Sequence, residues 1–287
     1  MTVPSTRPAD PFGAVAALPL VAQAAESARA SVDAALSHNL MRRRSAEVTV
    51  EAGLRSARAT AALEGADLPL EGFRRWSPDA ARVDAAGLEA AGLEAATVSG
   101  ALRLTAELGT VRGALERAPL QAFARLHLLA GAGAGAGGAG AADSLGRPRS
   151  GPVGDDLQLG QAPAAAEVAA RLTALAELLV ARTSAPALVV AALVQGELLA
   201  LRPFAWGNGL VARAAGRLVL VSRGLDVKAV TAPEVGHADD PAAYRAAALA
   251  YIAGDVTTWV LHCAHAVELG ARETLAICAA IERQAAR

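Results

Sequence analysis

The stretch of sequence that decides the fold is Leu201-Arg202-Pro203-Phe204-Ala205-Trp206-Gly207-Asn208-Gly209-Leu210-Val211-Ala212-Arg213. It follows a weakly polar run over Thr183 to Leu201, which contains a proline and a glutamate and therefore predicts a buried core helix rather than a membrane span. Glycines on both sides of Asn208 let the backbone turn sharply and approach a ligand. A helix beginning near Gly209 would point its free N–H groups at a bound anion. The same pattern is also an ordinary way to end one helix and start another.

This stretch resembles the signature of the Fic family, His-Pro-Phe-x-(Asp or Glu)-Gly-Asn-Gly-Arg-x-x-Arg. Members of that family typically move AMP from ATP onto a protein hydroxyl. The matching positions are Pro203, Phe204, Gly207, Asn208, Gly209 and Arg213. Three functional positions differ: Arg202 replaces the general base, Trp206 replaces the acidic Mg²⁺ ligand, and Leu210 replaces the first arginine. The resemblance implies the family's fold with a degenerate active-site motif.

The replaced side chains decide the expected chemistry. A guanidinium has a pKa above about 12 and only donates hydrogen bonds, so Arg202 is not a general base near neutral pH. An indole offers no oxygen to a cation that prefers octahedral oxygen ligands, so Trp206 does not hold Mg²⁺. We therefore expect no catalytic residue and no metal ligand in the motif.

Phosphate binding is compatible with the residues that remain. The expected anion- or nucleotide-binding residues are Arg202, Gly207, Asn208, Gly209 and Arg213, with Arg202 adding a phosphate donor. We expect Trp206 to stack on the pocket or occlude it. No cofactor is required, although ATP or another nucleotide without Mg²⁺ is a possible ligand.

A second segment, Ser56 to Gly65, is similar to the inhibitory helix of many Fic proteins, whose pattern is Ser/Thr-x-x-x-Glu-Gly/Asn. Thr60 and Glu64 are four positions apart and share one helix face, and Gly65 suits the end of that helix. The resemblance implies that Glu64 pairs with Arg213 and blocks productive placement of the ATP γ-phosphate. In a chain without a catalytic base, we favour a structural role for the pair over a working switch.

Helical patterns dominate the rest of the chain, which predicts an all-α, Fic-like domain with an N-terminal helical extension and a short flap. We expect a flexible terminus over 1–12, an N-terminal helical region with the inhibitory-type helix over 13–118, a Fic-like core over 119–265 and a C-terminal helix over 266–287. Within these ranges the pattern predicts helices over 255–269 and 271–287, with a break at Gly270, and a short extended connection over 225–230. His127, in a Leu-His segment that is also similar to the family, is expected to be a core or helix-packing histidine rather than a ligand. A Gly-Ala tract over 131–140 predicts a mobile loop, and Gly146 to Gly160 predicts the flap.

Composition narrows the class of protein. A net charge of −1 lacks the basic excess of a general nucleic-acid-binding surface. Hydrophobic residues reach 53% with only 3% aromatics, so alanine supplies the apolar character and predicts close helix packing. No secretory signal is visible, and the two cysteines, Cys263 and Cys278, fit a reducing compartment. We expect a cytoplasmic protein that contacts neither nucleic acid nor membrane.

The sequence thus predicts a nucleotide- or anion-binding regulatory pseudoenzyme without AMP-transferase activity. A scaffold that acts only through protein contacts is the main alternative, and a transferase with altered chemistry is the third. The pattern identifies neither the nucleotide nor a protein partner, and it leaves homo-oligomerisation open.

Overall fold

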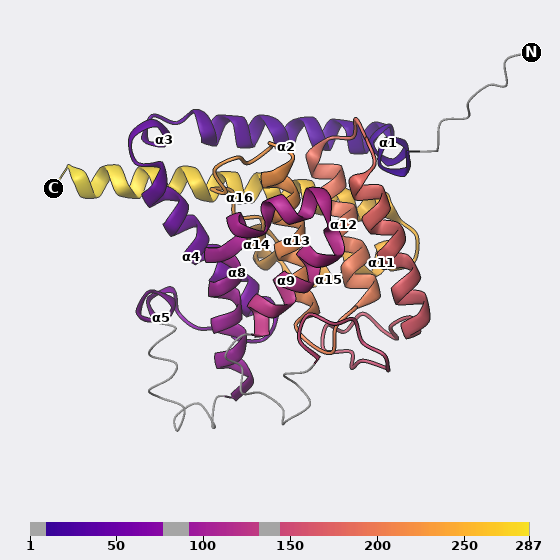
Figure 1. Cartoon of the computed structure of the whole chain (residues 1–287). Coiled ribbons are helices and arrows are strands. Elements are labelled where there is room, and N and C mark those ends of the chain that lie inside the picture. The colour runs from indigo at the N-terminus through magenta and orange to yellow at the C-terminus, as the bar shows by residue number, and fades with distance from the viewer. Residues whose placement is uncertain (1–9, 77–91, 132–143, 287) are drawn as a thin grey trace, which may run out of the picture.

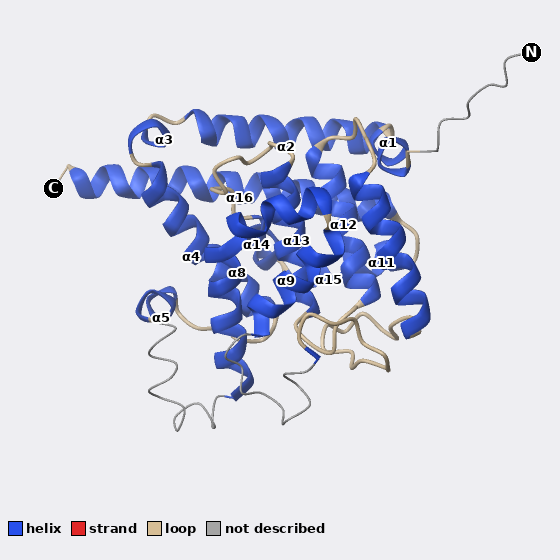
Figure 2. Cartoon of the chain, in the orientation of Figure 1, coloured by secondary structure: helices blue, strands red, loops and turns tan. Residues whose placement is uncertain are grey.

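The computed structural model describes residues 10–76, 92–131 and 144–286, and every regular element within these ranges is a helix (Figures 1 and 2). The helices are α1 (Pro11–Ala16), α2 (Pro19–Ser37), α3 (Leu40–Arg43), α4 (Ser45–Leu63), α5 (Leu70–Arg75), α8 (Gly92–Arg117), α9 (Pro119–Gly131), α11 (Ala165–Val180), α12 (Ala187–Leu201), α13 (Asn208–Ser222), α14 (Pro233–Asp239), α15 (Pro241–Ile252) and α16 (Val256–Ala285). The all-α prediction is therefore confirmed. Most of the expected flexible terminus and almost all of the Gly-Ala tract lie outside the described residues.

Helix α12 forms the centre of the molecule. All its residues from Leu188 to Leu201 are buried except Glu197, as expected of a helix that is apolar on every side. It packs against α13, α15 and α16 and ends at the motif (Figure 1). No helix in the described part of the chain is long and apolar enough to cross a membrane. The apolar run before the motif is thus a core helix that fixes the position of the turn that follows it.

The apolar core is continuous across the boundary that we expected near residue 118. Leu104 of α8, Phe123 of α9 and Leu198 of α12 belong to one buried cluster. Helices α8 and α9 pack closely on each other, and both contact α13. The N-terminal helical region and the motif-bearing region therefore share a core.

Small residues let the C-terminal helix approach its neighbours closely. A Cβ on Gly236 of α14 would lie 2.4 Å from the carbonyl oxygen of Ala266, and one on Gly270 would lie 2.7 Å from the Ala232 backbone. Helix α16 also runs beside α2 along one edge of the molecule (Figure 1). The sequence had predicted a helix break at Gly270, between helices over 255–269 and 271–287. That prediction is wrong, because this glycine allows close backbone contact in the middle of one continuous helix.

Residues 144–164 include the segment in which the flap was expected, and they contain no strand. It consists of turns and irregular backbone between α9 and α11. Residues 225–230, expected to be extended, also form turns, and the short helix α14 follows them.

Candidate functional site

The turn between α12 and α13 is held by its own asparagine. Gly207 adopts a left-handed conformation with φ of +67°, which glycine allows at little cost. The Asn208 side chain accepts a hydrogen bond from the Phe204 N–H and donates one to the Phe204 carbonyl, each at 2.9 Å. The Asn208 side chain thus holds the turn between Phe204 and the start of α13, which is a structural role.

Arg213 lies one helical turn further along α13 and reaches back to α4. Its side chain is only 1% exposed and donates to Thr60 Oγ1 at 2.6 Å, to the Thr60 carbonyl at 3.2 Å and to Tyr244 Oη at 3.4 Å. The nitrogen that donates to the Thr60 carbonyl, Nη2, also donates to Glu64 Oε1 at 2.6 Å. Burial disfavours the charge, but Tyr244 and Glu64 outweigh it and raise the pKa of Arg213. The structure therefore joins both residues singled out in the upstream segment to the motif arginine.

The Glu64 carboxylate lies directly over the first turn of α13. A Cβ placed on Gly209 would be 2.0 Å from Glu64 Oε1 and 3.1 Å from a terminal nitrogen of Arg213. Only glycine fits beneath this pair. The free N–H groups and positive dipole end of a helix attract an anion at this place. The Glu64 carboxylate of the chain itself lies beside this turn, paired with Arg213.

A cavity of about 310 Å³ adjoins this pair. The end of α4, the flap, α12, α13 and α15 all contribute to its wall, and the lining side chains that carry charge are Glu64, Asp156, Arg213 and Arg245. Ligand pockets typically start at about 300 Å³. Of the five residues expected to bind an anion, Arg213 is the one that lines this cavity, and Glu64 contacts both the cavity and the turn.

Arg202 is engaged with the flap. It ends α12 in a left-handed conformation with φ of +44°, and its guanidinium donates to Asp155 Oδ1 at 3.0 Å and to the Gly160 carbonyl at 2.6 Å. Burial lowers the pKa of Arg202, and Asp155 opposes that shift. Arg149 adds hydrogen bonds to the carbonyls of Leu201 and Arg202, so the flap is tied to the end of α12 from both sides.

Trp206 lies against α9 and is half-buried. Its ring centroid is 5.8 Å from that of His127, and a Cβ on Gly131 would be 3.0 Å from the indole. The ring does not line the 310 Å³ cavity. His127 is fully buried, stacks on Phe204 at 4.1 Å and accepts a hydrogen bond from the Gly146 N–H, and burial lowers its pKa to about 4. His127 is therefore a packing histidine, as expected.

A polar network next to Arg213 could not be predicted from the sequence. Gln195 of α12 lies 3.1 Å from His237 of α14, and His237 lies 3.1 Å from His262 of α16. Gln195 also donates to Tyr244 at 3.5 Å. Burial keeps the pKa of His237 well below its ordinary value. These residues come from four helices, so no local spacing could have linked them.

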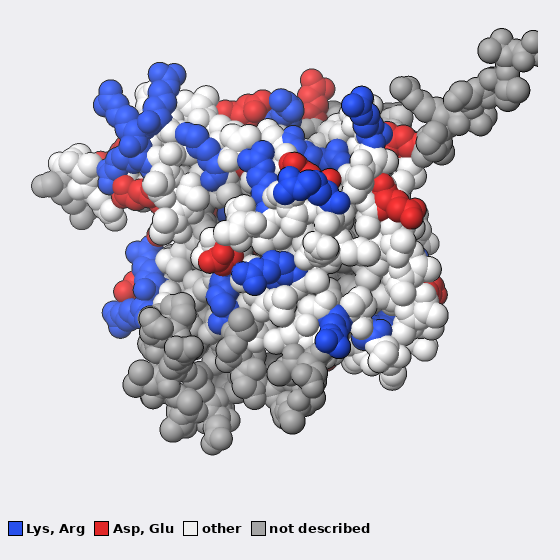
Figure 3. All heavy atoms as spheres, in the orientation of Figure 1, with Lys and Arg blue, Asp and Glu red and all other residues white. Residues whose placement is uncertain are grey.

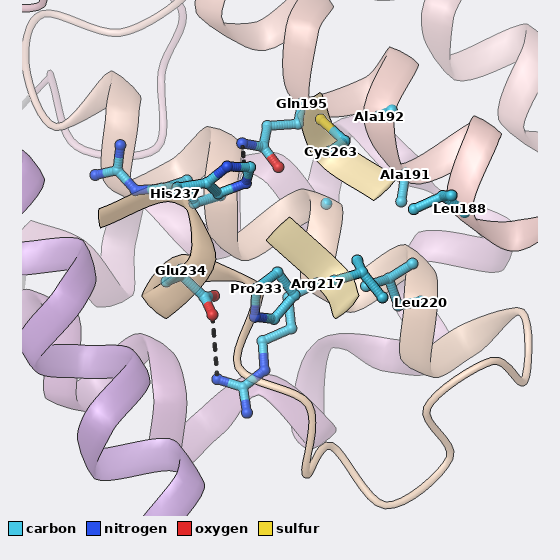
Figure 4. A pocket seen from close by; sticks show the side chains of 13 residues that line it. Leu188, Ala191, Ala192, Gln195, Arg217, Leu220, Pro233, Glu234, His237 and Cys263 are labelled. Atoms are coloured by element: carbon cyan, nitrogen blue, oxygen red, sulfur yellow. Dashed lines mark hydrogen bonds and ion pairs between the residues drawn. The ribbon is translucent and has the colours of Figure 1, made fainter. Parts of the chain in front are cut away.

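A small pocket of about 20 Å³ lies beside this network (Figure 4). Figure 4 shows Gln195 and His237 pointing toward each other at one side and Arg217 facing Glu234 at the other. Ser56 donates to Glu234 and accepts from Arg217, which joins α4 to α13 and α14. The volume is suited to a water molecule rather than to a substrate.

Both signs of charge appear on the face drawn in Figure 3, where Lys and Arg atoms are more prominent than Asp and Glu atoms. Basic atoms gather near α3, which carries Arg42 and Arg43.

The fold has counterparts among solved structures. A Fic family protein from Desulfovibrio desulfuricans G20 is similar with a TM-score of 0.68 at 20% sequence identity, covering 91% of this chain and 75% of that one. Residues 134–508 of Fic-1 from C. elegans are similar with a TM-score of 0.61 at 18% identity, covering 91% and 73%. No family model and no curated protein sequence matches the chain. The likeness establishes a Fic-like fold.

Proposed function

We propose that this chain, whose fold is Fic-like, is a regulatory pseudoenzyme that binds a nucleotide beside Arg213 and does not transfer AMP. The observation that carries the proposal is the cavity beside which the Glu64 carboxylate lies over Gly209 and pairs with Arg213. A ligand phosphate that displaced this carboxylate would meet both the Arg213 guanidinium and the N-terminus of α13.

The chemistry of the motif supports the loss of transfer. Arg202 only donates hydrogen bonds, and the structure gives it acceptors in the flap at Asp155 and Gly160. Trp206 supplies no oxygen for Mg²⁺. Leu210, which stands where the Fic signature has an arginine, is 1% exposed and faces α8. An attacking hydroxyl would find no base among the motif side chains.

The alternative function is that of a scaffold which acts through protein contacts and binds no nucleotide. Its support is that both buried motif arginines already have partners within the chain: Arg213 binds Thr60 and Glu64, and Arg202 binds the flap. A site whose two arginines already have acceptors within the chain needs no ligand to neutralise them. The two functions differ in whether removal of Glu64 opens a nucleotide site.

Calorimetric titration of AMP, ADP and ATP, with EDTA or with Mg²⁺, into the parent and the Glu64→Ala variant separates these functions. We expect weak binding to the parent and binding at least about tenfold tighter, or about 1.4 kcal/mol, to the variant, because the competing carboxylate is gone. Mg²⁺ should change the affinity little. Glu167→Ala is the matched control, because Glu167 is an exposed partner of Arg171 outside the cavity.

Labelled ATP with Mg²⁺ or Mn²⁺ should leave AMP on neither the protein itself nor generic protein targets, for the parent or for Glu64→Ala. A gain of AMP transfer in Glu64→Ala would refute the pseudoenzyme proposal. A folded Glu64→Ala variant that binds none of the three nucleotides would leave the scaffold function in its place.

A further inference from the structure

Two guanidinium groups face the 310 Å³ cavity, one from each of two helices. Arg213 comes from α13, and Arg245 comes from α15, next to Tyr244. Their settings differ. Arg213 is buried and paired with the Glu64 carboxylate, whereas Arg245 makes no ion pair with any of the described residues and donates to the Gln158 side-chain oxygen.

Each of these cations has an oxygen of the chain itself as its partner. Glu64 Oε1 lies 2.6 Å from the buried Arg213, and Gln158 Oε1 accepts a hydrogen bond from the exposed Arg245. The partner of Arg245 is a neutral amide. A phosphate oxygen forms a stronger, doubly charged hydrogen bond with a guanidinium than an amide does. An anionic ligand would therefore replace Gln158 more readily than it replaces Glu64.

Gln158, which contacts Arg245, lies in the flap and has an unusual backbone conformation. Gln158 has φ of +55°, which few residues other than glycine adopt. The Asp155 side chain fixes the turn by accepting the N–H groups of Leu159 at 2.7 Å and Gly160 at 2.9 Å, and Arg202 holds Asp155 in turn. Such conformations cluster where a site needs a group in a particular place. The motif residue Arg202 thus supports the presentation of Gln158 to Arg245.

We propose that Arg245 is the specificity-determining residue of this cavity and that it selects nucleotides with two adjacent phosphate groups over nucleoside monophosphates. The proposal rests on the proposed function, nucleotide binding beside Arg213. The first phosphate takes the place of Glu64, and the second takes the place of Gln158 on Arg245. In this chain Arg245 supplies a cation to a cavity in which Leu210 supplies none.

The test uses the full chain with Glu64→Ala as background, so that the first phosphate position is open. ADP and AMP are titrated in EDTA into Glu64→Ala, into Glu64→Ala with Arg245→Gln, and into Glu64→Ala with Arg112→Gln. Arg112 is an exposed arginine of α8 outside the cavity and controls for the loss of one positive charge. We expect Arg245→Gln to weaken ADP binding at least tenfold and AMP binding less than threefold, and Arg112→Gln to change neither.

Equal weakening of ADP and AMP by Arg245→Gln would overturn the proposal, because Arg245 would then contact a part that both ligands share, such as the base. No change for either ligand would overturn it as well. Failure of both nucleotides to bind the folded Glu64→Ala background is a different result: it refutes the proposed function, and the Arg245 proposal falls with it. In the Glu64→Ala background, Gln158→Ala should tighten ADP binding, because it frees Arg245. A gain in affinity of this kind is not produced by misfolding, so it tests the proposal even if an Arg245 variant fails to fold.

Discussion

Replacing Glu64 by alanine should cost the protein about 3 kcal/mol of unfolding free energy. Removing one partner of a buried ion pair typically costs about 3–5 kcal/mol, because the other charge is left without compensation. Arg213 is 1% exposed, but Glu64 is 13% exposed and Arg213 keeps its two contacts with Thr60. The expected cost is therefore at the lower end of that range.

The loss should appear as a lower melting temperature and a lower denaturant midpoint. With an unfolding entropy of about 2.1 cal/mol/K per residue, 287 residues give about 0.6 kcal/mol/K, so about 3 kcal/mol lowers Tm by about 5 °C. Glu167→Ala, which removes an exposed partner of Arg171, should change stability by less than about 0.5 kcal/mol. Equal melting temperatures for the parent and Glu64→Ala would refute the argument that this pair supports the fold.

Two further predictions concern His127 and Arg202. Burial lowers the pKa of His127 to about 4 from an ordinary value near 6.5, so as the pH falls the unfolded chain binds this proton before the folded chain does. The free energy of unfolding should therefore decrease between about pH 6.5 and about pH 4, by up to about 1.4 kcal/mol per pH unit from this residue. Denaturant unfolding at several pH values should show a shallower loss for His127→Gln, and an unchanged slope would contradict the assignment. Arg202→Met should speed amide hydrogen exchange at Leu159 and Gly160, because Asp155, which accepts both N–H groups, loses its ion pair with Arg202. Exchange in α12 should stay slow. Equal exchange rates in the flap of the parent and the variant would show that Arg202 does not hold the flap.

The sequence predicted those parts of the structure that local pattern controls. The apolar run before the motif gave a buried helix, and the two glycines around Asn208 gave the turn that begins α13. The proximity of Glu64 to Arg213 could be predicted only from the resemblance to a known family, since 149 positions separate them.

Contacts between distant segments account for what the sequence did not predict. Arg202 was expected to face a phosphate, but its partners Asp155 and Gly160 lie in the flap, where no periodic pattern indicates which side chain turns inward. Gly270 looked like a helix end because a glycine in a sequence does not reveal whether it bends the chain or admits a neighbouring backbone. The network of Gln195, His237 and His262 depends on how α12, α14 and α16 pack.

The engagement of Arg202 with the flap makes substitution at this position costly. Histidine at position 202 is too short to reproduce a guanidinium that binds the Asp155 carboxylate and the Gly160 carbonyl together. Such a substitution would release the turn that presents Gln158 before it provided any benefit from an imidazole. A change at this position toward the histidine of the Fic signature would therefore pass through a variant with a loosened flap, and selection for stability would oppose it.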